Sequence, residues 1–118
     1  MEKVKVLNLS KGTIILEEAE VADNFFLRLK GLLGRSGLLP GKGLLIKPCK
    51  AVHTVGMSFP IDVGFVDKEG CICCQMENMF PNQFSPTVRK AKFVIEAPAG
   101  TFQMTETAVG DYIELIKI

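Results

Sequence analysis

Short apolar runs, some alternating with polar residues and some continuous, recur along the chain and predict a protein built mainly of β-strands. Residues 3–7 alternate with the two-residue period of a half-buried strand, and residues 13–17 form a β-branched run. Residues 8–12 between them have turn composition, so we expect a first hairpin. Further runs predict strands at residues 44–46, 61–66, 71–76, 92–97 and 112–118, which gives about seven short strands in all.

One stretch has the longer period of an amphipathic helix. Asp23 is the expected N-cap, and the spacing predicts one main helix over about residues 23–33, ended by Gly34. Its apolar face is expected to pack on the sheet. The residues on that face are Phe25, Phe26, Leu29, Leu32 and Leu33. A further helical turn is expected around residues 101–106.

The clearest local signal is a second hairpin, in which residues 61–66 pair with residues 71–76. The turn between them is Asp67–Gly70, where Gly70 supplies a positive φ. Strands joined mainly by short turns, with one main helix, indicate a β-rich α+β fold. We therefore expect residues 1–118 to form a single domain with a curled or barrel-like antiparallel sheet.

Composition narrows the possible partners and compartments. The 14 basic and 13 acidic residues are interspersed and leave a net charge of +1, which favours neither nucleic acid nor an anionic membrane as a partner. No apolar run approaches the roughly 18 residues of a membrane span, and the N-terminus lacks the apolar core of a signal peptide. We expect a cytoplasmic location, unless a leader has been removed, with the four cysteines reduced.

Candidate chemistry gathers just before the second hairpin. Cys49, His53, Thr54 and Met57 fall within nine residues, ahead of Pro60. A separation of four residues can bring an imidazole within hydrogen-bond reach of a thiolate on a tight turn, so Cys49 and His53 are candidate nucleophile and base. The alternative is a half-buried thiol and a loop histidine that binds backbone carbonyls.

A metal site is a second possibility for these residues. Cys71 and Cys73 share one strand face and, with Cys49 and His53, would complete a tetrahedral Cys3His shell. The cysteine spacing lacks a C-x2-C pair, however, and buried cysteines often act as small apolar residues. The sequence therefore predicts no metal and no cofactor.

Two charged residues extend the candidate site. Asp62 opens a strand next to the His53 loop, where its carboxylate can bind His53 or, as an equal alternative, accept backbone N–H groups. Arg35 follows the predicted helix and is a candidate anion contact, although an arginine in this position more often remains solvated or caps carbonyls.

The ordered motifs of the chain resemble the DUF192 family of small, uncharacterised single-domain proteins. Five segments carry the likeness: Gly31–Arg35, His53–Val63, Asp67–Gly70, Glu96–Gly100 and Gly110–Asp111. At Gly56 members of the family often have an aromatic residue. The resemblance implies a β-rich fold with one helix, and it assigns no catalytic residue.

The leading hypothesis is a binding module for a small ligand or peptide. Its pocket would lie at the loop Cys49–Met57, with Arg35, His53, Thr54 and Asp62 as ligand contacts. One alternative is a thiol-dependent hydrolase or transferase that uses Cys49 and His53. Another is a protein-interaction module without a small-molecule site. The ligand, the reaction and the oligomeric state stay open at this point.

Overall fold

The computed structural model describes residues 2–118, which form one seven-stranded sheet and two short helices. The strands are β1 (Lys3–Asn8), β2 (Thr13–Ala22), β3 (Lys42–Ile46), β4 (Ile61–Asp67), β5 (Ile72–Met79), β6 (Ala91–Pro98) and β7 (Ile113–Lys117). The helices are α1 (Phe25–Lys30) and α2 (Thr101–Met104). The β-rich fold with about seven strands is thus confirmed, as is the helical turn that we expected near residue 101.

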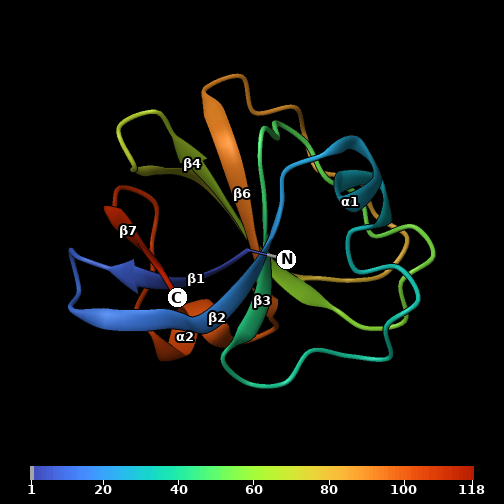
Figure 1. Ribbon diagram of the computed structural model, residues 1–118, viewed down its shortest axis with the longest axis horizontal. Helices are drawn as coiled ribbons and strands as arrows, with labels where there is room; N and C mark the ends of the chain where they lie inside the picture. The colour runs from blue at the N-terminus through green and yellow to red at the C-terminus, as the bar shows by residue number, and fades with distance from the viewer. Residues whose placement is uncertain (1) are drawn as a thin grey trace.

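The sheet has the strand order β5-β4-β6-β3-β2-β1-β7 and is strongly curled (Figure 1). Its two edge strands approach each other at one end, where the Ile72 N–H donates to the Asp111 carbonyl (2.9 Å) and the Ile113 N–H to the Gly70 carbonyl (2.8 Å). One pairing corrects the expected antiparallel pattern, because β2 and β3 run parallel. Residues 23–41 supply the crossover connection that a parallel pair requires.

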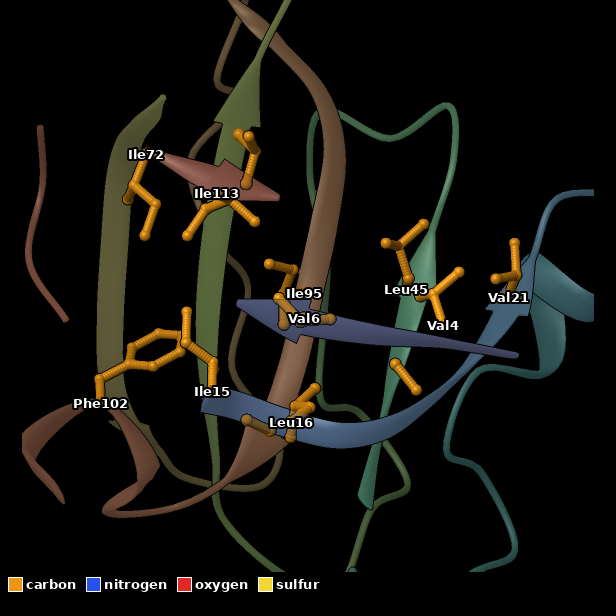
Figure 2. Close-up of a cluster of buried hydrophobic side chains, with 13 residues drawn as sticks. Val4, Val6, Ile15, Leu16, Val21, Leu45, Ile72, Ile95, Phe102 and Ile113 are labelled. Carbon is orange, nitrogen blue, oxygen red and sulfur yellow. The ribbon is translucent and has the colours of Figure 1, made fainter. Parts of the chain in front are cut away.

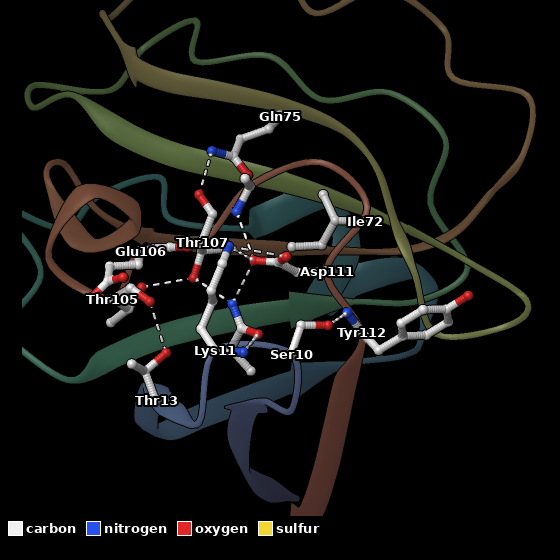
Figure 3. A network of polar contacts seen from close by, with 12 residues as sticks. Ser10, Lys11, Thr13, Ile72, Gln75, Thr105, Glu106, Thr107, Asp111 and Tyr112 are labelled. Carbon is white, nitrogen blue, oxygen red and sulfur yellow. Dashed lines mark hydrogen bonds and ion pairs between the residues drawn. The ribbon is translucent and has the colours of Figure 1, made fainter.

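A polar network fixes the corner where the sheet edges meet (Figure 3). The Asn8 amide donates to the Thr107 hydroxyl (3.1 Å) and to the Asp111 carboxylate (2.9 Å), and Lys11 Nζ forms an ion pair with the same carboxylate at 2.9 Å. Gln75 of β5 donates to the Thr107 carbonyl (3.0 Å). These bonds join the first hairpin, β5 and the segment before β7, so Asp111 is a structural residue of this corner.

Apolar side chains fill both faces of the central strands. The interior of the curl holds one cluster, to which β1, β2, β3, β4, β5, β6, β7 and α2 all contribute (Figure 2). A second cluster lies on the opposite face of β3, β4 and β6, under the long loops and Leu32. Because these strands are buried on both faces, their sequences are nearly continuous apolar runs.

Helix α1 confirms the predicted main helix but is shorter than residues 23–33. Only part of the predicted apolar face packs on the core, since Leu32 is buried in the second cluster and Leu33 packs against it. Helix α1 begins after Asn24, whose side chain accepts the Leu27 N–H (2.9 Å), and ends at Gly31, where φ is 49°. It buries no residue, and Phe25, Phe26 and Leu29 are exposed by 64%, 78% and 64%. Figure 1 shows α1 beside the long loops, on the side of the molecule opposite α2. Neither helix in residues 2–118 is long and apolar enough to cross a membrane.

Candidate functional site

A cleft of about 380 Å³ lies between α1 and the loop that follows β3. One wall consists of Phe25 and residues 28–33, and the other of residues 48–53 and Met57. The sheet contributes Ile46 and Glu96. The volume falls at the small end of the range of about 300–1,000 Å³ typical of ligand pockets, and the wall is mostly apolar, as such pockets usually are.

The loop wall is held in place by hydrogen bonds to the start of β6 and to the segment that precedes it. The Cys49 N–H donates to the Lys92 carbonyl (3.2 Å), and the Val52 N–H donates to Ser85 Oγ (2.9 Å). The ammonium group of Lys50 donates to the carbonyls of Arg89 and Ala91. The loop is therefore fixed, and the charge of Lys50 is directed to the protein backbone.

The two candidate catalytic residues both line this cleft, but each has another partner. Cys49 is half-buried and its Sγ donates to the Ala51 carbonyl at 3.2 Å. Burial raises the pKa of the Cys49 thiol, and the nearby charge of Glu96 raises it further. His53 is exposed, and its Nδ1 accepts the Val55 N–H at 3.2 Å. The imidazole ring of His53 lies 5.9 Å from the ring of Phe84, measured between centroids. Because its pKa is raised, the Cys49 thiol is protonated at neutral pH.

Glu96 is the residue that sequence reasoning missed as part of the site. It lies in β6 between Leu44 of β3 and Val63 of β4, both fully buried and apolar. Its side chain faces the cleft and is only 4% exposed, and no donor among residues 2–118 forms a hydrogen bond with its carboxyl group. Burial raises the pKa of Glu96 to about 7. The available signal was an acidic residue within the apolar run of a strand buried on both faces.

Arg28 of α1 provides a second polar group at the cleft. Its Nη1 donates to the Pro48 carbonyl at 3.1 Å, which ties the helix to the opposite wall. Its Nε is buried and has no acceptor within the described chain. A buried, unpaired donor typically costs about 1–3 kcal/mol, so a ligand that accepts a hydrogen bond from Nε would remove this cost.

The three other predicted ligand contacts do not line this cleft. Thr54 is fully buried, and its hydroxyl bonds to the Phe80 carbonyl (2.6 Å) and the Gln83 N–H (2.9 Å). Arg35 forms an ion pair with Glu20 at 3.0 Å. These contacts fix the surrounding loops, and roles for Thr54 and Arg35 in ligand binding stay predictions.

Asp62 has a structural task of its own. Its carboxylate is fully buried and accepts the backbone N–H groups of Asn78 (2.8 Å), Gly100 (3.1 Å) and Phe102 (3.0 Å). It borders a separate hollow beside α2, which also has a volume of about 380 Å³. We expected Asp62 either to bind His53 or to accept backbone N–H groups, and its contacts are of the second kind.

The residues of the hypothetical Cys3His shell are not gathered into one group. Within residues 2–118, no three His, Cys, Asp or Glu side chains cluster in an arrangement suited to a metal ion. The four cysteines are free thiols, and Cys73 Sγ donates to the Phe65 carbonyl at 3.5 Å.

Comparison with known proteins confirms the family resemblance. The model of the DUF192 family, described as "Uncharacterized ACR", matches residues 6–115. A UPF0127 protein of Pyrococcus abyssi is 32% identical over 117 residues, which are 94% of this chain and 97% of the relative. A UPF0127 protein of Pyrococcus furiosus is 31% identical over 115 residues, with 92% and 96% covered.

Two solved structures have the same fold. A protein from Sinorhizobium meliloti 1021, described as a candidate transcription regulator, superposes with a TM-score of 0.81 at 25% identity, with 97% of this chain and 92% of that one covered. A protein of unknown function from Novosphingobium aromaticivorans gives a TM-score of 0.81 at 21% identity, with 95% and 83% covered.

Proposed function

The chain belongs to the DUF192 family, and on that premise we propose that it binds a small ligand or a peptide in the cleft between α1 and the loop Pro48–His53. The observation that carries this proposal is the carboxyl group of Glu96, which lies at a buried position of the sheet, faces the cleft and accepts no hydrogen bond from residues 2–118. Burial of an unpaired carboxyl group is unfavourable, so such a group is most readily explained by a ligand that binds it.

The surface around the cleft supports the same proposal. The exposed side chains of Phe25 and Leu29 line the cleft, and that of Phe26 is exposed beside them. This apolar rim suits a ligand that continues beyond the cleft, as a peptide does. The interspersed charges, with a net charge of +1, favour such a ligand over nucleic acid. A cytoplasmic location stays part of the proposal.

The thiol-dependent enzyme receives less support from the same residues. A catalytic cysteine needs a lowered pKa, whereas burial raises the pKa of Cys49. A base must also accept the proton of the nucleophile, whereas Sγ donates to Ala51 and His53 Nδ1 accepts from Val55. The protein-interaction alternative retains support from the apolar rim of α1, which buries no side chain of its own.

Binding in the cleft can be tested by filling it from its rim. Ala51 is exposed and lines the cleft, so Ala51→Trp obstructs the cleft without disturbing the core. Ala108→Trp, at an exposed position outside the cleft, is the matched control. In an NMR screen of small apolar compounds and short peptides, we expect saturable shifts in α1 and residues 48–53 of the wild type and the control.

The Ala51→Trp variant should lose those shifts while keeping the dispersed spectrum of a folded protein. Shifts that persist in Ala51→Trp, or that map only to surfaces remote from the cleft, would contradict the proposal. If the shifts follow the exposed faces of Phe25 and Phe26 and require a protein partner, the interaction module is the better description.

A further inference from the structure

The chemistry of the cleft narrows the class of ligand, and this inference rests on the proposed binding function. Among the described residues that line the cleft, Glu96 is the one acid. The other titratable or charged side chains on the wall are Arg28 and Lys30 of α1 and Cys49, Lys50 and His53 of the loop. The neighbours of Glu96 in β3 and β4, Leu44 and Val63, contribute none.

None of the basic side chains neutralises Glu96. Lys50 donates to the carbonyls of Arg89 and Ala91, and Arg28 donates through Nη1 to the Pro48 carbonyl. Lys30 is exposed at the end of α1. The cause of the raised pKa of Glu96 is burial, and no nearby cation lowers it. Among the described residues of the wall, no basic side chain therefore supplies a counter-charge to Glu96.

A buried carboxyl group with a pKa of about 7 is partly ionised at neutral pH. In an apolar cleft the group that stabilises its anion best is a cationic donor, because charge-assisted hydrogen bonds are about twice as strong as neutral ones. The surrounding wall is apolar, with Leu32, Ile46 and Met57 all buried. We propose that the ligand carries a primary ammonium group on a compact apolar skeleton, and that the ammonium group binds the carboxylate of Glu96.

Two kinds of molecule offer this chemistry: a free hydrophobic amine and the apolar N-terminal residue of a peptide. The peptide N-terminus adds a carbonyl group next to its ammonium group. The buried Nε of Arg28 lacks an acceptor in the described chain and can donate to such a carbonyl. A second contact of this kind gives the peptide N-terminus an advantage over the plain amine.

The test uses the full chain and four probes in NMR titrations at millimolar concentrations. The probes are leucinamide, 3-methylbutylamine, N-acetyl-leucinamide and 4-methylpentanamide, which is leucinamide without its amino group. We expect saturable shifts at residues 48–53 and in α1 with the two amines, and binding weaker by about tenfold or more for the two probes without an ammonium group.

The pH dependence identifies the partner of the ammonium group. 3-Methylbutylamine resembles a lysine side chain and stays protonated well above pH 7. Its affinity should therefore fall between about pH 8 and about pH 5, as Glu96 takes up a proton. Glu96→Gln should weaken both amines by about tenfold and remove this pH dependence. Glu114→Gln, at an exposed position of β7, is the matched control and should change neither.

The outcomes distinguish failure of the ammonium assignment from failure of the binding function. Equal binding of all four probes in the cleft, unaffected by Glu96→Gln, overturns the ammonium assignment and leaves the binding function intact. No saturable shift with either amine also overturns the assignment, and the broader fragment screen with Ala51→Trp then decides the binding function. Tighter binding of leucinamide than of 3-methylbutylamine indicates a peptide N-terminus, and equal binding indicates a free amine.

Discussion

Replacing Glu96 with glutamine is expected to stabilise the protein at alkaline pH and to leave its stability nearly unchanged in acid. Burial raises the pKa of Glu96 from its ordinary value of 4.5 to about 7 in the folded protein. Below pH 4.5 the carboxyl group is protonated whether the chain is folded or unfolded. As the pH rises towards 7, the unfolded chain releases the proton first, so the folded state loses relative stability.

The size of this effect follows from the two pKa values. Each pH unit between them corresponds to about 1.36 kcal/mol, so the interval from 4.5 to about 7 amounts to about 3 kcal/mol above pH 7. Glutamine has nearly the same shape as the protonated acid and cannot ionise. The variant should therefore gain about 3 kcal/mol near pH 8, or roughly 10 °C in melting temperature, and about zero near pH 4.

Urea denaturation followed by circular dichroism near pH 4 and near pH 8 measures both values. Glu114→Gln replaces an exposed carboxyl group on β7, and we expect it to change stability by less than about 0.5 kcal/mol at either pH. An equal gain in free energy of unfolding at both pH values for Glu96→Gln, or no gain near pH 8, would show that folding does not raise the pKa of Glu96.

Three further predictions concern Asp62, Asp111 and Cys49. Asp62→Ala leaves three backbone N–H groups without their acceptor, so we expect a loss of about 3 kcal/mol or more in urea denaturation, with a smaller loss for Asp62→Asn. Burial raises the pKa of Asp111, but hydrogen bonds from Asn8 and Lys11 outweigh it and the pKa is lowered from 3.8. The ionised carboxylate of Asp111 therefore stabilises the folded wild type, and this stabilisation should be lost as the pH falls through the lowered pKa. Asp111→Asn lacks this stabilisation at every pH. Parallel acid titrations of both proteins by circular dichroism check the difference. Because the pKa of Cys49 is raised, its alkylation by iodoacetamide should be slow at neutral pH and faster above pH 9. Mass spectrometry follows the labelling, with Cys49→Ser as the control. Rapid labelling of Cys49 at neutral pH would contradict the raised pKa.

The strands were predictable because their signals are local. The turn Asp67–Gly70 requires a positive φ, and Gly70 adopts 83° there, so the hairpin of β4 and β5 is specified by adjacent residues. The parallel pairing of β2 and β3 was not predictable in this way. It depends on how residues 23–41 cross between the strands, which no local period encodes.

Helix α1 shows where periodicity misleads. Phe25 and Leu29 have the spacing of a core-facing helix, yet both are exposed because they line the open cleft, whereas Leu27 of the same helix packs against the second cluster. The site presents a similar difficulty. Cys49 and His53 were found from their clustering in sequence, whereas Glu96 and Arg28 reach the cleft from distant elements and become site residues only through the tertiary fold.

A crystal structure of the protein soaked with small apolar fragments would show directly whether ligands bind in the cleft between α1 and the loop Pro48–His53. Some of the fragments should carry an ammonium group and some should lack one. We expect fragment density against Leu32 and Ile46, next to Glu96. Fragments that occupy other surfaces while this cleft stays empty would contradict binding in the cleft.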